Sequence, residues 1–112
     1  MLGSHEGRHY KSDARSALQM SLQSDLAARF AEGDRKSGAA FLMMVLMEEV
    51  GELAEAVRRG ERDEARAEVA DVAFMALSLA NVLDVDVESA VRAKFLARAK
   101  GDVTKSWTDV PP

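Results

Sequence analysis

The chain has 112 residues and a formal net charge of −4, which suits a single domain and does not provide the cationic surface that binds duplex nucleic acid. The absence of cysteine excludes disulfides, thiolate metal sites and cysteine nucleophiles, and it fits a cytoplasmic protein. No apolar run reaches the length that spans a membrane, so we expect neither a nucleic acid nor a membrane as a partner.

The residue types favour helices. Hydrophobic residues make up 47% of the chain and aromatic residues only 5%, and a mixture dominated by Ala, Leu, Val and Met favours helices over β-sandwiches. We therefore predict an all-α, four-helix, bundle-like fold. A single helical domain is expected over residues 13–101, between a flexible N-terminal segment, 1–12, and a C-terminal tail, 102–112.

The first predicted helix is capped by Ser12 or Asp13 and runs to about Glu32. Its apolar residues recur every four positions and form one stripe along the helix: Leu18, Leu22, Leu26 and Phe30. Gly33 followed by Asp34 is expected to end this helix, since glycine is favoured just after a helix C-terminus.

The next two helices are predicted to form an antiparallel hairpin. The second helix covers about residues 37–59, with Gly60 as its stop, and the third covers about residues 62–83. The short turn between them places the two helices side by side. Gly51 lies inside the second helix, where glycine costs up to about 1 kcal/mol relative to Ala, so it indicates the close approach of another backbone.

The fourth helix is predicted to begin after Asp86, which can cap it together with Ser89, and to end near residue 100. Lys94 and Arg98 lie on one face of this helix, because residues four apart are neighbours on a helix surface. Such a cationic pair can hold phosphate groups. The alternative is a solvated basic face near a helix C-terminus, where cations are favoured.

Carboxylates interrupt the apolar stretch MVLMEEVGELAEAV of the second helix. At about 100° per residue, Glu49 lies among the apolar residues of the helix, and Glu52 lies about 60° to one side of it. Glu48 lies about 100° away on that same side. Glu49 and Glu52 therefore do not lie opposite the apolar face, and Glu48 lies at its rim.

The third helix repeats this pattern. Asp71 is the only charged residue of the stretch 69–83, and Glu68 lies three residues before it on the same face. Pairing the two helices is expected to bring four carboxylates together: Glu49, Glu52, Glu68 and Asp71. Because converging half-buried carboxylates repel one another, they either have raised pKa values or bind cations. An all-oxygen set suits Mg²⁺ or Mn²⁺, and an open magnesium site shares its ligand shell with phosphates.

A solvated side chain is the alternative for any single glutamate on a helix. Glu55, Glu61 and Glu64 are interpreted in this way. Solvation does not readily explain two acidic pairs within the apolar stretches of adjacent helices. The functional interpretation therefore rests on these two pairs.

Taken together, the two acidic motifs resemble the MazG family of nucleotide pyrophosphohydrolases, within the all-α NTP pyrophosphatase superfamily. The family pattern EExxE followed by ExxD reads here as EEVGE at residues 48–52 and EVAD at residues 68–71. The resemblance covers about residues 34–100. It implies Mg²⁺-dependent hydrolysis of a nucleoside triphosphate substrate to monophosphate and pyrophosphate, with the removal of aberrant nucleotides as the expected role.

The resemblance also implies a role for each motif residue. The metal ligands would be Glu49, Glu52, Glu68 and Asp71. Glu48 matches the first residue of the motif, which implies that it orients or deprotonates the attacking water. Lys94 matches a lysine common in the family, whereas Arg98 stands where many members have Asn. Asn81 is expected to contact the sugar or a phosphate, or to be a polar residue at the end of the third helix.

The third predicted helix is apolar nearly all round over residues 69–83, as expected of a helix that is buried on every side. One chain of this size leaves part of that surface uncovered. We therefore expect a homodimer or a homotetramer, with the nucleotide pocket near a subunit interface, and the resemblance agrees.

Three other interpretations were weighed. A dUTPase-like or phosphoribosyl-ATP pyrophosphohydrolase-like enzyme of the same superfamily has the same kind of site. A di-iron or di-manganese carboxylate bundle needs Glu-x-x-His on two helices, and residues 37–101 contain no histidine. A non-enzymatic helical dimerisation or regulatory module explains the apolar third helix and leaves the acidic pairs unexplained.

Overall fold

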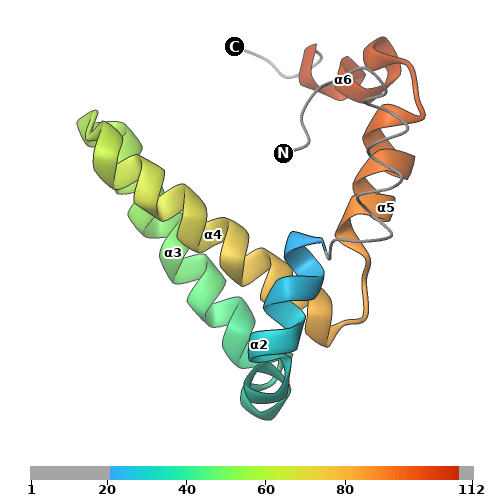
Figure 1. The fold of residues 1–112 in the computed structure, drawn as a ribbon. Coiled ribbons are helices and arrows are strands. Elements are labelled where there is room, and N and C mark those ends of the chain that lie inside the picture. Colours follow the sequence, from blue (N-terminus) through green and yellow to red (C-terminus); the bar gives the residue numbers. More distant parts are fainter. Residues whose placement is uncertain (1–20, 109–112) are drawn as a thin grey trace, which may run out of the picture.

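The computed structural model describes residues 21–108, with side chains as far as Thr104. These residues form helices joined by short turns, in the order α2 (Leu22–Ser37), α3 (Ala39–Arg59), α4 (Arg62–Val82), α5 (Val87–Val91), the π-helical turn η1 (Arg92–Leu96) and α6 (Lys100–Thr108). The predicted all-α class is confirmed. Figure 1 shows the arrangement, in which α3 and α4 lie side by side and α2 crosses them near one end.

The first helix ends later than the sequence predicts. Its predicted beginning lies outside the described residues, and its predicted end at Glu32 is wrong, because α2 continues through Gly33 to Ser37. The chain turns instead at Gly38, where φ is 90° and the N–H donates to the Asp34 carbonyl at 2.9 Å. A lone glycine costs a helix only about 1 kcal/mol, whereas the sharp turn requires a positive φ that glycine adopts freely.

Two contacts hold α2 against α4. The rings of Phe30 and Phe74 meet edge to face, with centroids 5.2 Å apart and planes at 83°. Further along, Gln23 Nε2 donates to Asn81 Oδ1 at 3.0 Å. The earlier residue of α2, Gln23, meets the later residue of α4, Asn81, whereas Phe30 meets Phe74. The two helices therefore pack antiparallel.

The hairpin of α3 and α4 is as predicted. The turn is closed by Gly60, in the left-handed conformation with φ 69°, whose N–H donates to the Val57 carbonyl at 3.1 Å. The next amide, Glu61 N–H, donates to the Ala56 carbonyl at 3.0 Å. This pair of bonds is the Schellman motif that ends many helices. The most buried side chains of the two helices are Leu42, Ala56, Met75, Ser78 and Ala80.

The predicted fourth helix is divided in the structure. Its cap is confirmed, because Asp86 Oδ1 accepts from the Ser89 N–H at 3.3 Å. The helix then widens into the π-helical turn, closed by the bond from Ala97 N–H to the Arg92 carbonyl at 2.9 Å. The helical run therefore ends at Leu96, short of the predicted residue 100.

A further helix follows where a tail was predicted. The boundary expected at residue 101 lies inside α6, which begins at Lys100. We call residues 87–108 the C-terminal arm. Nothing in the local sequence marks the break between η1 and α6. No helix of the hairpin packs along the arm, so no tertiary contact holds η1 and α6 on a common axis.

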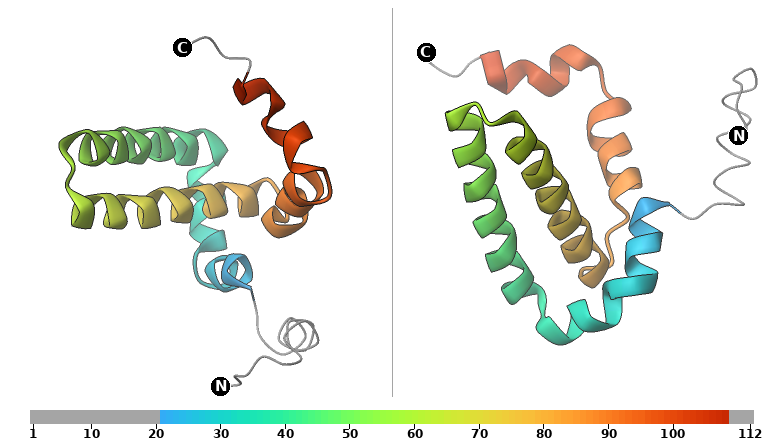
Figure 2. Two further views of the ribbon diagram at one scale, coloured as in Figure 1. Left: turned by 90° about the horizontal axis from the view of Figure 1, so that it is seen from above. Right: turned by 60° about the vertical axis from the view of Figure 1, so that its left-hand side comes forward.

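The arm makes the described part of the chain open rather than compact. Figures 1 and 2 show α5 leading away from the hairpin, and Figure 1 shows α6 turning back at a distance from it. The radius of gyration is 17.3 Å, against about 13 Å for a compact domain of this length. Among the helices of residues 21–108, none is both long and apolar enough to cross a membrane.

Candidate metal centre

Three of the predicted carboxylates converge between α3 and α4. Glu49, Glu68 and Asp71 each offer one oxygen, and the three oxygens lie within 4.8 Å of one another. Glu49 reaches this position because it lies two turns from both Leu42 and Ala56, which are buried on the side of α3 that faces α4. We call these three residues the carboxylate cluster.

Helix α4 places its two acids in the same way. Glu68 and Asp71 begin a strip that continues with Met75 and Ser78, at the spacing of one helix face, and both of these later residues are buried. The strip is therefore acidic at Glu68 and Asp71 and buried at Met75 and Ser78. Glu68 is half-buried and Asp71 is exposed, so the cluster is open to solvent on one side.

The electrostatics of the cluster are unfavourable without a cation. A hydrogen bond shared with the Glu68 carboxylate raises the pKa of Glu49 above 4.5, and partial burial and the negative charges of Glu68, Asp71 and Glu48 raise it further. The Oε1 atoms of Glu49 and Glu68 are buried and have no hydrogen-bond partner. Because buried oxygens without partners cost free energy, these atoms fit the ligand shell of a hard divalent cation.

The other two acids of the EEVGE motif lie outside this group. Glu48 and Glu52 are both exposed on α3. Glu52 lies about 60° around the helix from Glu49 and about one turn further along it, on the rim of the seam. The structure therefore brings three of the four predicted ligands together, and the fourth stands beside them.

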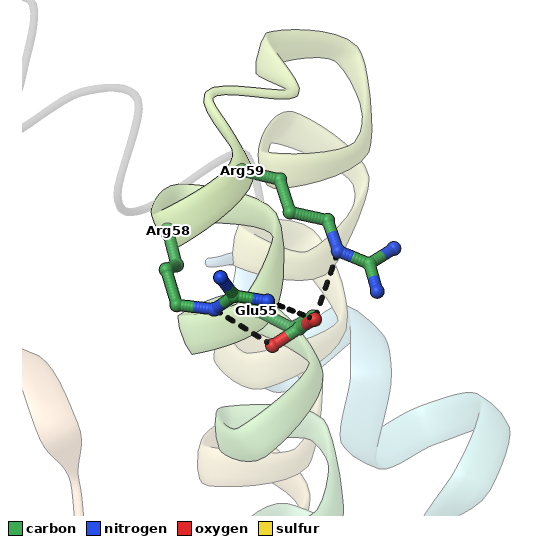
Figure 3. A network of polar contacts seen from close by, with 3 residues as sticks. All are labelled: Glu55, Arg58 and Arg59. Carbon is green, nitrogen blue, oxygen red and sulfur yellow. Dashed lines mark hydrogen bonds and ion pairs between the residues drawn. The ribbon is translucent and has the colours of Figure 1, made fainter.

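Glu55 belongs to a different arrangement, shown in Figure 3. Its carboxylate accepts from Arg58 Nη2 at 2.7 Å and pairs with Arg59 Nε at 2.8 Å. Both arginines come from the last turn of α3. These exposed pairs compensate Glu55 within its own helix, so it is a partnered surface residue rather than a member of the cluster.

Asn81 forms a clasp with Gln23. Its Oδ1 accepts from Gln23 Nε2 at 3.0 Å, and its Nδ2 donates to the Gln23 carbonyl at 3.3 Å. The same Gln23 side chain donates to the Val85 carbonyl at 2.7 Å and accepts from the Val87 N–H at 2.9 Å. Asn81 thus helps to fix the link between α4 and α5, and its predicted contact with substrate stays a prediction.

Lys94 and Arg98 lie on the C-terminal arm, away from the cluster in this chain. Lys94 Nζ stands 5.5 Å from the centre of the Phe95 ring. Arg98 donates to the carbonyls of Lys94 at 3.5 Å and Asp102 at 3.4 Å. Both cations are exposed, and neither bonds to a carboxylate among the described side chains.

Sequence reasoning missed Gln23. It is a single amide in the first turn of α2, and nothing local distinguishes it from a solvated glutamine. Its importance depends on residues that follow it by about sixty positions, namely Asn81, Val85 and Val87. Contacts at such separation follow from how the helices pack and are not visible as a local pattern.

Comparison with known families agrees with the site. The family model of the MazG nucleotide pyrophosphohydrolase domain matches residues 38–100. That span is more than half of the chain and contains the whole carboxylate cluster. No curated protein and no solved structure shows a significant match. The chain therefore belongs to the MazG nucleotide pyrophosphohydrolase domain family.

Proposed function

We propose that this protein is a Mg²⁺-dependent pyrophosphohydrolase that converts a nucleoside triphosphate and water to the monophosphate and pyrophosphate. Family membership supports nucleotide pyrophosphohydrolase activity in general. The observation that carries the finer proposal is the convergence of Glu49, Glu68 and Asp71 within 4.8 Å. Such a cluster can bind a divalent cation, and the cation in turn binds the phosphates of the substrate.

The residues present fit such a cation. Glu49 and Glu68 each direct an oxygen without a partner into the seam, and Asp71 closes the group from the solvent side. The donors are all carboxylate oxygens, which Mg²⁺ and Mn²⁺ prefer. When bound, the cation supplies positive charge that neutralises the triphosphate beside the carboxylates and stabilises charge that develops on the scissile phosphoanhydride.

The chain's own side chains define the rest of the reaction. Glu52, on the rim of the cluster, is placed to complete the ligand set when substrate is present. Glu48 lies on the same side of α3 and is exposed, so its carboxylate is free to orient water and accept its proton as the water attacks phosphorus. No covalent intermediate is required, because residues 38–100 contain no cysteine, histidine or serine–base pair in a nucleophile arrangement.

The nucleotide must also meet cations from the protein, since a triphosphate keeps negative charge after one or two metals have bound. Lys94 and Arg98 are the proposed phosphate contacts, because arginine and lysine supply charge-assisted hydrogen bonds to phosphate oxygens. Aberrant nucleotides are the proposed physiological substrates.

The protein is further proposed to act as a homodimer or homotetramer. The outer face of α3 carries a series of exposed apolar residues at alternating spacings of four and three: Met43, Met47, Val50, Ala54 and Val57. This is the pattern of a helix that packs against another helix. Beside it, Gly51 is exposed, and a Cβ placed there would meet no described atom within 4 Å. The close approach of another backbone that Gly51 predicts is therefore not made by residues 21–108.

The proposal is tested by following products across a panel of canonical-base and modified NTPs and dNTPs with Mg²⁺. The expected products are monophosphate and pyrophosphate in equal amounts. Release of inorganic phosphate with a nucleoside diphosphate would show attack at the terminal phosphorus and contradict the proposed reaction. Absence of turnover over the whole panel, with Mg²⁺ and with Mn²⁺, would contradict the enzyme assignment.

A further inference from the structure

A cavity of about 480 Å³ lies where α2, α4 and α5 meet. Each of these helices contributes an apolar side chain to its wall: Leu22, Leu77 and Val87. Leu77 and Val87 are half-buried, whereas Leu22 is 65% exposed. The cavity is separate from the carboxylate cluster, because Leu77 lies about 9 Å further along α4 than Asp71 and about 120° around it. An occupant of the cavity would cover apolar surface that the described helices leave open.

The backbone changes direction at Ser21, on the rim of this cavity. Ser21 is extended, with φ −68° and ψ 163°, and its Oγ accepts from the Ser24 N–H at 3.0 Å. An N-cap of this kind begins a helix and does not continue one from the residues before it. The predicted apolar stripe is therefore interrupted between Leu18 and Leu22. Leu18 does not take the place one turn before Leu22 on the same helix.

Residues 13–20, which we call the leading segment, join the described chain at Ser21. They read DARSALQM and include two large apolar residues, Leu18 and Met20. Met20 is bonded directly to Ser21. The Cα of Leu18 is at most about 11 Å from that of Ser21, since an extended chain spans up to about 3.6 Å per residue. Both side chains are thus held within reach of the cavity, at an effective concentration on the order of millimolar.

The charges of the N-terminal residues and of the cavity are complementary. Residues 1–20 contain three arginines and lysines against two acids, and one of these cations, Arg15, lies in the leading segment. The α5 wall of the cavity has the opposite excess, with Asp86 and Glu88 against Arg92. Opposite charges within about 10 Å attract at moderate salt. The same acids disfavour an anionic occupant such as a nucleotide, so charge favours the leading segment.

We propose that the leading segment docks in this cavity, with Leu18 and Met20 packed against its apolar wall. Docking covers Leu22 and connects α2, α4 and α5 through one further set of contacts, because all three helices line the cavity. It adds to the Gln23 clasp, which ties α2 to the start of α5 through the Val87 N–H. The leading segment then holds the root of the C-terminal arm, and this inference does not depend on the proposed function.

The labelling rate of a single cysteine tests the docking in the full chain. The chain has no cysteine, so Leu18→Cys and Ser4→Cys each introduce one thiol, the first inside the leading segment and the second outside it. Docking predicts that Leu18→Cys reacts with a maleimide at least about tenfold more slowly than Ser4→Cys, because a covered group reacts only after local opening. Urea should abolish the difference. Equal rates in native buffer would contradict the docking.

A charge placed on the cavity wall provides the matched control. Leu22 is 65% exposed, so Leu22→Asp leaves the buried core unchanged and puts a carboxylate among the apolar contacts. In the Leu18→Cys chain, this substitution should raise the labelling rate to that of Ser4→Cys. Ala28→Asp adds the same charge at an exposed position of α2 and should leave the protection in place. Protection that survives Leu22→Asp, or that is lost equally with Ala28→Asp, would overturn the inference.

A crosslink distinguishes the chain's own leading segment from that of a second copy. Leu18→Cys with Ser89→Cys places two thiols at the cavity for a short bismaleimide. Leu18→Cys with Arg62→Cys is the control, since Arg62 lies about 22 Å along α4 from Leu77. In a mixture of isotope-labelled and unlabelled chains, docking predicts links within single chains for the first pair and few links for the second. Links between labelled and unlabelled chains, equal linking in both pairs, or no link to Ser89→Cys would contradict the proposal.

Discussion

Glu49 of α3 and Glu68 of α4 face each other across the hairpin seam, and the Oε1 atom of each is buried without a hydrogen-bond partner. The fold places them there through its own packing, since Glu49 repeats the position of Leu42 and Ala56 on α3, both of which are buried. The hairpin therefore keeps two carboxylates where an apolar pair would be more stable. That cost is consistent with a binding site rather than with a structural role.

Removing one of these charges should stabilise the metal-free protein. Glu49→Gln keeps the shape of the side chain and removes its repulsion by Glu68, Asp71 and Glu48. We expect a higher melting temperature than wild type in a chelating buffer. Glu55→Gln is the control, because it removes an acid of the same helix that is paired with Arg58 and Arg59, and it should be neutral or slightly destabilising. A lower melting temperature for Glu49→Gln would argue that the cluster is not strained.

The pH dependence of stability follows from the same residue. The pKa of Glu49 is raised above 4.5 in the folded state, so the folded protein binds this proton more tightly than the unfolded chain. The contribution of Glu49 is fully present below 4.5 and is lost as pH rises through the raised value. In chelator, the stability advantage of Glu49→Gln should grow as pH rises from 4.5 towards neutrality, measured by urea unfolding at a series of pH values. An advantage that does not change with pH would contradict this account.

Divalent cations should stabilise the wild-type protein. A ligand that binds only the folded state adds about 2.7 kcal/mol at a hundred times its dissociation constant, so millimolar Mg²⁺ or Mn²⁺ should raise the melting temperature and excess chelator should reverse the rise. Asp71→Asn should lose most of the shift, because one of the three converging ligands becomes neutral. An equal shift in wild type and Asp71→Asn would place the cation elsewhere.

The Gln23 clasp should contribute to the stability of the fold. Gln23→Ala removes the partners of Asn81, the Val85 carbonyl and the Val87 N–H, and leaving such groups unpaired costs about 1–3 kcal/mol. Urea unfolding measures this loss. Gln23→Glu is an informative second variant, since it keeps the acceptor for Val87 and loses the donor to Val85, so it should be destabilised as well. Wild-type stability in both variants would contradict a structural clasp.

The aromatic pair between α2 and α4 should show direct coupling. Phe30 and Phe74 meet edge to face at 5.2 Å, an arrangement worth about 0.5–1.5 kcal/mol beyond the area that the rings bury. A double-mutant cycle with Phe30→Leu and Phe74→Leu should return a coupling energy of that size. Additive effects of the two substitutions would mean that the rings do not interact in solution.

The hairpin and its cluster were predictable because their signals are local. Gly60 marks the turn by its freedom to take a positive φ, and the spacing of Glu68 and Asp71 places both on one helix face. Glu52 shows the limit of that reasoning, since an offset of about 60° is enough to move a side chain from the seam to its rim.

The remaining differences arise from contacts, or the lack of them, between distant parts of the chain. Gly33 is compatible with a helix as well as with its end, and α2 continues past it until the chain turns at Gly38. Asn81 is engaged by Gln23, 58 residues away. The break after Leu96 lies in an arm that has no hairpin helix packed along it.

The most direct test of the central claim is pyrophosphate release from nucleoside triphosphates with saturating Mg²⁺, compared between wild type, Glu49→Gln and Glu55→Gln. The account predicts release by wild type and by Glu55→Gln at similar rates, and a loss of at least about a hundredfold in Glu49→Gln, as expected when a group that stabilises the transition state is removed. Comparable rates in Glu49→Gln and Glu55→Gln would contradict the assignment of the carboxylate cluster as the active site.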